Sequence, residues 1–181
     1  NKFDRVHGRT GSDLMVHGDC SSRGCYAMTD EGIAEIYALV RESFAGGNSV
    51  VQMQIFPFRM TPQKLAAHSA DPSIDFWMNI KEGYDRFELS KTPPAWDVCE
   101  KKYVFDLRRE DGQPLEASAS CPPRGNDPLL TALQAKQAAD KQIFDTQVAA
   151  ITEREQKAVA TAEAEAAAKA AAKARGEAVG G

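Results

Sequence analysis

The sequence has no long apolar run and no dense cluster of basic residues. No segment approaches the roughly 20 apolar residues that a membrane-spanning helix needs, so we expect no transmembrane segment. The net charge is −4, and there is no run of Lys or Arg that could bind a phosphate backbone. We therefore expect no nucleic-acid partner.

Cysteine is also scarce: the chain has Cys20, Cys25, Cys99 and Cys121. Four are too few for a disulfide-dense small protein, and their spacing, without a nearby His, is not that of a zinc site. We expect no metal. One catalytic thiol and one structural pair fit better. Cys99 and Cys121 form either a disulfide, which would suit an oxidising compartment, or two free buried thiols.

The chain has 181 residues, enough for one ordinary domain and an extension. It begins at Asn1 rather than at Met, in a segment that already resembles the interior of a domain. We therefore expect a fragment or a processed form whose export signal lay upstream.

Strands and a loop are predicted in the first third of the chain. The apolar run Asp13–His17 predicts a buried strand that ends at Gly18. The polar, Gly-containing segment 19–25 predicts a loop. The β-prone run 50–56, closed by Pro57, predicts a second strand.

A helix is predicted between these two strands. Thr29 or Asp30 can cap its start, and Glu31 in its first turn is favourable at the positive helix end. Gly46, followed by Gly and Asn, ends it. Apolar residues at helical spacing predict its buried face: Ile33, Ile36, Tyr37, Val40 and Phe44.

The rest of the chain separates into an irregular part and a helical part. Residues 75–87 predict a helix broken near Gly83, and residues 95–99 and 103–105 predict short strands. Residues 128–178 carry a sparse apolar stripe and then mostly Ala, Glu and Lys, which favour a helix with little to bury. We predict a solvated helix or a partly frayed tail, able to act as a semi-rigid spacer.

The stretch that can carry chemistry lies between His17 and Cys25. A cysteine attacks an acyl carbon only as the thiolate, so it needs a nearby base. A histidine at a strand end, with a short loop leading back to the cysteine, can supply that base. Gly24 lets backbone amides approach an oxyanion without a side chain between them. A helix that begins near Thr29 can direct further N–H groups to the same place.

Other residues compete for these roles, and each has a structural explanation as well. Cysteine is commonly a small buried hydrophobe, and Cys20 is a second candidate nucleophile that lacks the preceding glycine. His7 is a second candidate base, although its His-Gly pair could equally be a substrate-side or structural turn. His68 lies in a polar segment and is interpreted as an ordinary surface histidine.

The same residues resemble a known family. His17-Gly18 followed by Ser22-Arg23-Gly24-Cys25 resembles the L,D-transpeptidase (YkuD) signature, His-Gly and then Ser-His-Gly-Cys. The resemblance is close over residues 3–61, thinner over 76–105 and absent beyond about Asn126. The flanking segments are similar to the YafK-like branch of murein L,D-transpeptidases: Phe3-Asp4-Arg5, His7-Gly8-Arg9-Thr10-Gly11, Met15-Val16-His17-Gly18, Gly24-Cys25-Tyr26-Ala27-Met28-Thr29-Asp30 and Phe56-Pro57-Phe58-Arg59-Met60-Thr61.

The chain departs from the family signature beside the nucleophile. Arg23 stands where the signature has histidine, and Tyr26-Ala27 replace the usual aliphatic residue and Arg or Asn. The loop before Cys25 is also shorter than in many relatives. These differences fit the YafK-like branch, and they fall where better-known members line the acyl-donor site, so they bear on substrate preference.

The resemblance implies a mixed α/β fold. It implies a mainly β L,D-transpeptidase-like catalytic domain, with its first strands missing from this sequence, followed by a C-terminal Ala-rich helical extension. Residues 1–61 would be the C-terminal part of that domain and 62–125 an extension packed on it. Residues 126–181 would be a low-complexity helical tail.

The resemblance also implies a mechanism. In this family a cysteine thiolate attacks the carbonyl of meso-diaminopimelate in a peptidoglycan stem peptide and forms a thioester, which an amine or water then resolves. Carried over, Cys25 is the nucleophile and His17 the general base. The backbone amides of Gly24 and Cys25 stabilise the oxyanion, and no metal or organic cofactor is expected.

Four further residues form the predicted substrate side of the site. Arg23 either binds a substrate carboxylate, as a guanidinium can do through two hydrogen bonds, or forms a salt bridge on the loop. Arg9 could play the same part, and His7 sits in the same segment. Ser22 is expected to hydrogen-bond within the loop and set its shape.

Three functions stay open. Some members of the YafK-like branch are thought to hydrolyse the link between murein and its covalently attached outer-membrane lipoprotein, so both cross-linking and hydrolysis fit the resemblance. A non-catalytic murein-binding scaffold, whose Ala-rich helix engages a partner, is the alternative from another class. The family implies a periplasmic, cell-envelope location in a Gram-negative bacterium.

Overall fold

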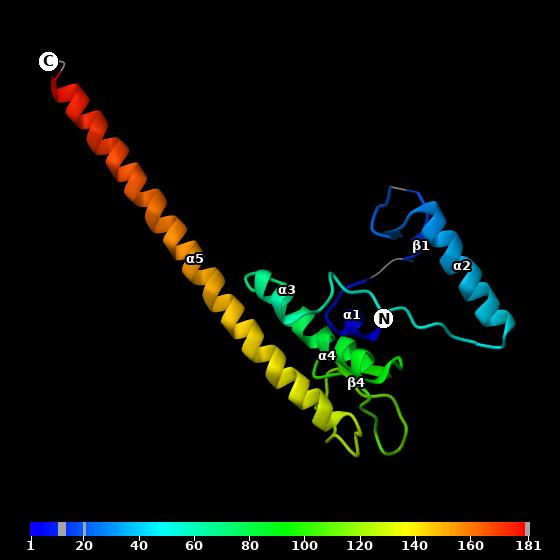
Figure 1. Cartoon of the computed structure of the whole chain (residues 1–181). Coiled ribbons are helices and arrows are strands. Elements are labelled where there is room, and N and C mark those ends of the chain that lie inside the picture. Colours follow the sequence, from blue (N-terminus) through cyan, green and yellow to red (C-terminus); the bar gives the residue numbers. More distant parts are fainter. Residues whose placement is uncertain (11–13, 20, 180–181) are drawn as a thin grey trace. The chain divides into compact units, whose positions relative to one another are not determined.

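The computed structural model describes residues 1–10, 14–19 and 21–179. The chain packs into two compact units, each built from two separate segments (Figure 1). Unit 1 comprises Asn1–Ile55 and Pro93–Gly125, and unit 2 comprises Phe56–Thr92 and Asn126–Gly181. The fold mixes helices and strands, with small sheets and one long C-terminal helix. The division into three consecutive domains stays a proposal.

In unit 1 the stretch around the candidate nucleophile folds as strand, loop, strand and helix. β1 (Val16–His17) pairs in parallel with β2 (Tyr26–Ala27), and α2 (Asp30–Ala45) follows directly. Thr29 caps α2 because its side chain accepts a hydrogen bond from the Gly32 N–H, and Gly46 is the C-cap. Both predicted ends of this helix are confirmed.

Several expectations for this region are wrong in the described structure. The buried strand predicted at 13–17 is reduced to Val16–His17, and Leu14 and Met15 are exposed. The predicted buried face of α2 is largely uncovered, with Tyr37 67% and Phe44 50% exposed. Residues 50–56 form no strand, and Val50 is 77% exposed. An apolar stripe marks a side that can be buried, and β-prone residues favour a strand only beside a pairing neighbour. The mainly β character implied by the resemblance is likewise not seen, since the described strands are four and short.

The second part of unit 1 is a hairpin. β3 (Trp96–Cys99) pairs antiparallel with β4 (Lys102–Phe105). The two strands were predicted from the sequence, but their pairing was not. The two turn residues, Glu100 and Lys101, both have positive φ, +50° and +58°. This is the pattern of a type I′ turn, whose twist matches that of the strands it joins.

A disulfide closes the segment that follows the hairpin. Cys99 is bonded to Cys121, with their Cα atoms 5.3 Å apart, so the predicted pair is a disulfide rather than two thiols. Cys99 is buried together with Leu107 and Leu115. Closing this loop restricts the unfolded chain and is typically worth about 3 kcal/mol. α1 (Lys2–Val6) packs on the hairpin, where the buried Phe3 ring stacks 4.5 Å from that of Tyr103.

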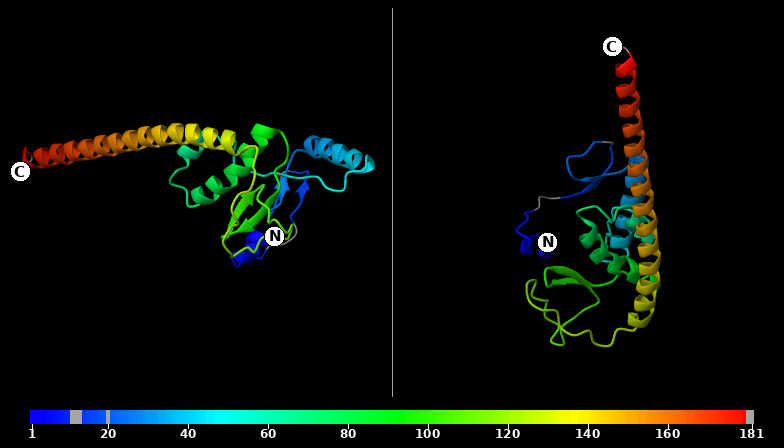
Figure 2. Two further views of the ribbon diagram at one scale, coloured as in Figure 1. Left: turned by 90° about the horizontal axis from the view of Figure 1, so that it is seen from below. Right: turned by 90° about the vertical axis from the view of Figure 1, so that its left-hand side faces the viewer.

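Unit 2 is helical. It contains α3 (Pro62–Ala67), α4 (Ile74–Ser90) and α5 (Leu130–Val179), and α3 and α4 lie against the first half of α5 (Figures 1 and 2). Its most buried apolar side chains are Met60, Leu65, Ala66 and Leu133. α4 runs unbroken through Gly83, which is buried, so the predicted break is wrong. A single glycine costs a helix only about 1 kcal/mol, which packing can offset.

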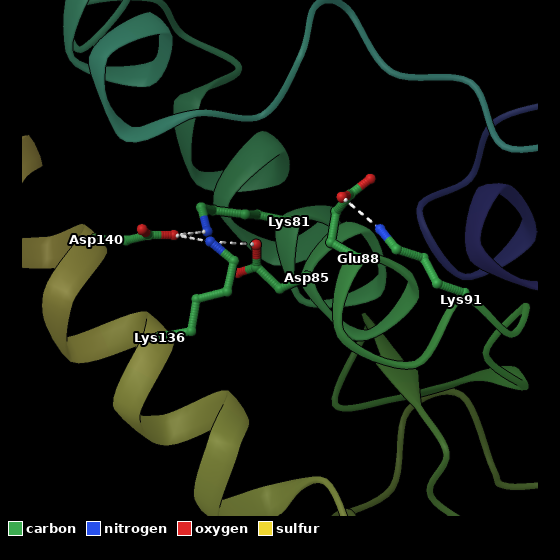
Figure 3. A network of polar contacts seen from close by, with 6 residues as sticks. All are labelled: Lys81, Asp85, Glu88, Lys91, Lys136 and Asp140. Carbon is green, nitrogen blue, oxygen red and sulfur yellow. Dashed lines mark hydrogen bonds and ion pairs between the residues drawn. The ribbon is translucent and has the colours of Figure 1, made fainter.

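Buried ion pairs connect α4 to α5 (Figure 3). Lys81 donates to Asp85 on α4 and to Asp140 on α5, the latter at 2.6 Å, and Lys136 binds Asp140 at 2.7 Å. Beyond Ile151 the side chains of α5 are exposed as far as Gly176, as predicted for a solvated helix. Among the described helices, none is both long and apolar enough to cross a membrane.

Candidate active site

His17 and Cys25 lie at the two strands of the parallel pair. The register pairs His17 with Ala27, and Cys25 comes directly before β2. Hydrogen bonds from Tyr26 N to Met15 O (2.9 Å) and from Met28 N to His17 O (2.8 Å) join the strands. Side chains alternate along a strand and register partners share a face. The side chains of His17 and Ala27 therefore share a face of the pair, and Cys25 lies two residues before Ala27, just outside β2.

The His17 ring has a defined hydrogen-bond partner. Its Nδ1 lies 2.5 Å from the carbonyl oxygen of Gly18. A carbonyl oxygen only accepts, so Nδ1 carries the hydrogen, and in the neutral ring Nε2 is left as the acceptor. That is the tautomer a general base needs. The ring is half-buried.

The Ser22 hydroxyl shapes the loop before the nucleophile. It donates to the Cys25 carbonyl oxygen at 2.8 Å and accepts from the Gly24 N–H at 3.3 Å. These are the hydrogen bonds within the loop that were expected of Ser22, while its place on the substrate side of the site stays a prediction. Gly24 has φ +117°, a conformation that L side chains rarely adopt. Its N–H is bound to Ser22 in this structure, so it has to exchange that partner before it can contact an oxyanion.

Cys25 is a half-buried free thiol, and the residues on both sides of it are exposed. Within the part of the chain that the structure describes, Arg23 forms no hydrogen bond or ion pair, so its guanidinium is open to a substrate carboxylate. Cys20, the competing nucleophile, lies outside the described residues.

His7 and Arg9 are engaged elsewhere. His7 Nδ1 donates to the Phe3 carbonyl oxygen at 2.9 Å, and its ring packs 4.3 Å from the Phe3 ring. Arg9 pairs with Asp4 at 3.2 Å and lies 5.2 Å above Phe3. Both therefore support α1, which favours the structural explanation of this second His-Gly segment.

The turn after His17 contains a contact that the sequence did not indicate. The Asp19 N–H donates to Asp30 Oδ1 at 2.8 Å, and Asp19 has φ +69°. A Cβ atom on Gly18 would lie only 2.3 Å from the same oxygen. Asp30 was predicted only as a helix-capping residue. The one sequence signal that another group comes close to the backbone after His17 was the glycine at position 18.

Two hollows are relevant to binding. An open groove of about 720 Å³ lies beside this turn, lined by Asp19 and residues 27–30. A more enclosed cavity of about 310 Å³ lies among α3, α4 and α5 of unit 2. Neither hollow is lined by a predicted site residue. Over the described ranges, no group of three or more His, Cys, Asp or Glu side chains is arranged to hold a metal ion.

Known proteins resemble most of this chain. It is 45% identical over 120 residues to two curated proteins, each named "Putative L,D-transpeptidase YafK", from Escherichia coli strain K12 and Escherichia coli O157:H7. The match covers 65% of this chain and 49% of each relative, so the chain spans about half the length of these relatives. No protein-family profile matches the chain.

Proposed function

Since the chain belongs to the YafK-like L,D-transpeptidase family, we propose that it carries out cysteine-dependent acyl transfer on peptidoglycan stem peptides. Cys25 is the nucleophile and His17 its base. The observation that carries the proposal is the His17 ring, whose Nδ1 is bound to the Gly18 carbonyl so that Nε2 is left as acceptor. His17 lies on β1, which pairs with β2, and Cys25 directly precedes β2.

In the first half of the reaction, His17 Nε2 takes the thiol proton and the Cys25 sulfur forms a bond to the substrate carbonyl carbon. The resulting oxyanion is stabilised by the N–H groups of Gly24 and Cys25, the former after its release from Ser22. Collapse of this intermediate breaks the carbon–nitrogen bond. The amine leaves with the proton from His17, and a thioester remains on Cys25.

In the second half, an amine or a water molecule attacks the thioester. His17 takes the proton of the attacking group and the Cys25 thiolate leaves. Arg23, which is exposed two residues before Cys25, binds a carboxylate of the donor peptide in this proposal. The substrate is of the meso-diaminopimelate type, and the site is expected to act in the periplasm of a Gram-negative envelope without a metal or cofactor.

Hydrolysis is the second candidate outcome of the same chemistry, and the exposure of the loop favours it. Ser22, Arg23, Gly24 and Tyr26 are all exposed in this structure, so water can reach a thioester on Cys25. Cleavage of the murein–lipoprotein link would be such a reaction. Incubating the chain with a tetrapeptide stem, with and without an added amine acceptor, separates the two by the mass of the product.

The deciding test of catalysis is turnover of a stem peptide by the wild-type chain and by Cys25→Ala. We expect Cys25→Ala to lose at least about 10³-fold of the rate, because the covalent route is removed. Cys20→Ala is the control and should keep much of the activity. Undiminished turnover by Cys25→Ala would show that the chain acts without this thiol and would end the proposal of a thioester at Cys25.

A further inference from the structure

We propose that Asp30 is a positioning residue for His17 and acts through the peptide group that joins Gly18 to Asp19. The role rests on the proposed function of His17 as the base for Cys25. Neither the resemblance nor the spacing of the motif assigned any part to Asp30 beyond capping α2.

A single peptide group connects the two side chains. Its C=O, from Gly18, accepts the hydrogen bond from His17 Nδ1 at 2.5 Å. Its N–H, from Asp19, donates to Asp30 Oδ1 at 2.8 Å. The C=O and N–H of a trans peptide are coplanar and point in opposite directions. The Asp30 carboxylate therefore sets the orientation of the carbonyl that holds the His17 ring.

The surroundings hold Asp30 against this peptide. Asp30 is the first residue of α2, whose start is fixed by the bond from Gly32 N–H to the Thr29 side chain at 3.1 Å. Its Oδ1 lies so near the Gly18 Cα that a Cβ atom there would come within 2.3 Å. Asp19 adopts φ +69°, which is uncommon for a residue other than glycine. A strained turn of this kind persists only where its neighbours enforce it.

The charge on Asp30 adds to the geometry. A hydrogen bond from an N–H to a carboxylate is stronger than one to a neutral acceptor, and linked hydrogen bonds polarise each other. By accepting from the Asp19 N–H, the Asp30 carboxylate polarises the peptide group and makes the Gly18 carbonyl oxygen a better acceptor. The stronger hydrogen bond keeps the hydrogen of His17 on Nδ1 and stabilises the ring when Nε2 takes the thiol proton. An aspartate that contacts the histidine directly does the same in a Ser-His-Asp triad.

Three variants of the full chain separate the parts of this role. Asp30→Asn keeps an oxygen that can accept from Asp19 but removes the charge, and Asp30→Ala removes both. Glu31→Gln is the matched control. It removes the same charge from the same first turn of α2, and Glu31 has no hydrogen bond or ion pair with another described residue. Circular dichroism should show equal helix content in all of them.

The first readout is the tautomer of His17, measured at about pH 8 by long-range ¹⁵N–¹H correlation on histidine-labelled protein. The chain has three histidines, and a His17→Gln variant assigns the signal. We expect the Nδ1–H form in the wild type, Asp30→Asn and Glu31→Gln, and a mixture with the Nε2–H form in Asp30→Ala. An unchanged Nδ1–H signal in Asp30→Ala would overturn the proposal.

The second readout is the reactivity of Cys25, as stem-peptide turnover and as the rate of alkylation by iodoacetamide. We expect a loss of about 100-fold for Asp30→Ala, because a base displaced by about 1 Å costs that much. The loss for Asp30→Asn should be about tenfold, and Glu31→Gln should match the wild type. Trypsin cleaves after Arg23, so Cys20 and Cys25 fall on separate peptides and alkylation of each is quantified alone.

The two readouts distinguish failure of this proposal from failure of the proposed function. If the His17 tautomer shifts in Asp30→Ala while turnover and alkylation stay at wild-type rates, the positioning role is wrong. If tautomer and alkylation both respond to Asp30 but Cys25→Ala still turns over the stem peptide, the thioester function is wrong and the positioning of His17 stands.

Discussion

Among single residues, Asp97 connects the N-terminal helix to the hairpin through its hydrogen bonds. Its Oδ1 accepts from Lys2 Nζ at 2.5 Å and from the Val98 N–H at 2.7 Å, and its Oδ2 accepts from the Leu115 N–H at 2.8 Å. Burial alone would raise the pKa of Asp97. The hydrogen bonds from Lys2, Leu115 and Val98 outweigh burial and hold the pKa below its usual value.

A lowered pKa in the folded state makes unit 1 less stable in acid. The contribution of Asp97 is complete above the unfolded pKa of about 4 and is lost as the pH falls through the lower folded value. We therefore expect the unfolding free energy of unit 1 to fall below about pH 4 more steeply in the wild type than in Asp97→Asn. Urea titrations at several pH values measure this through Trp96 in a Trp77→Phe background. Equal pH dependence in the two proteins would contradict it.

Local hydrogen bonds can be anticipated from the sequence. Ser22 could be expected to bond within the loop because its partners lie within three residues along the chain, whereas the oxyanion role of Gly24 stays a prediction. Asp30 could not be connected to His17, because its bond to the Asp19 N–H spans eleven residues and depends on the left-handed backbone at Asp19. The assignment of Cys25 and His17 to catalysis stays a prediction until turnover is measured.

At the scale of elements, the α4–α5 contact combines buried charges with apolar packing. Asp85 is fully buried and Lys81 is 6% exposed, and both depend on partners from α5 (Figure 3). Lys136 reaches Asp85 at 3.3 Å and Asp140 at 2.7 Å. Burial alone would raise the pKa of Asp140, but hydrogen bonds from Lys136 and Lys81 outweigh it and lower the pKa.

Lys81→Met should therefore destabilise unit 2 strongly. It leaves Asp85 buried without its hydrogen-bond donor on α4, and breaking a buried pair in this way costs about 3 kcal/mol or more. Lys157→Met is the matched control, since Lys157 pairs with Glu153 at the same helical spacing but at the surface, where a pair is worth less than about 1 kcal/mol. Urea unfolding followed through Trp77 in a Trp96→Phe background gives both values. Similar losses in the two variants would refute the distinction.

The elements that could be predicted are those whose own residues carry the signals for where the element begins and ends. Thr29 and Gly46 define α2 at both ends, and the hairpin strands 96–99 and 102–105 pair with each other. The run 50–56 failed because a strand requires a partner that the sequence pattern does not supply. The continuity of α4 through Gly83 was missed because packing decides whether a helix tolerates a glycine.

At the scale of the whole molecule, the two parts of α5 contribute differently to the stability of unit 2. Its first part carries the stripe Leu133, Phe144, Val148 and Ile151, whose members are buried or half-buried. From 152 to 176 every side chain is exposed. Ala, Glu and Lys dominate this second part, so it is helical through local propensity rather than through packing.

Truncation after Ile151 should therefore leave the unfolding midpoint of unit 2 unchanged while removing much of the helical circular dichroism signal. Truncation after Asp127 is the contrasting variant. It removes Leu133, Lys136 and Asp140 and leaves Lys81 and Asp85 without their α5 partners, so unit 2 should lose several kcal/mol. Trp77 fluorescence in urea measures both. A lower unfolding midpoint after truncation at Ile151 would mean that residues 152–181 stabilise unit 2. Stem-peptide turnover should also persist after truncation at Ile151, because acyl transfer at Cys25 needs none of the exposed residues 152–181.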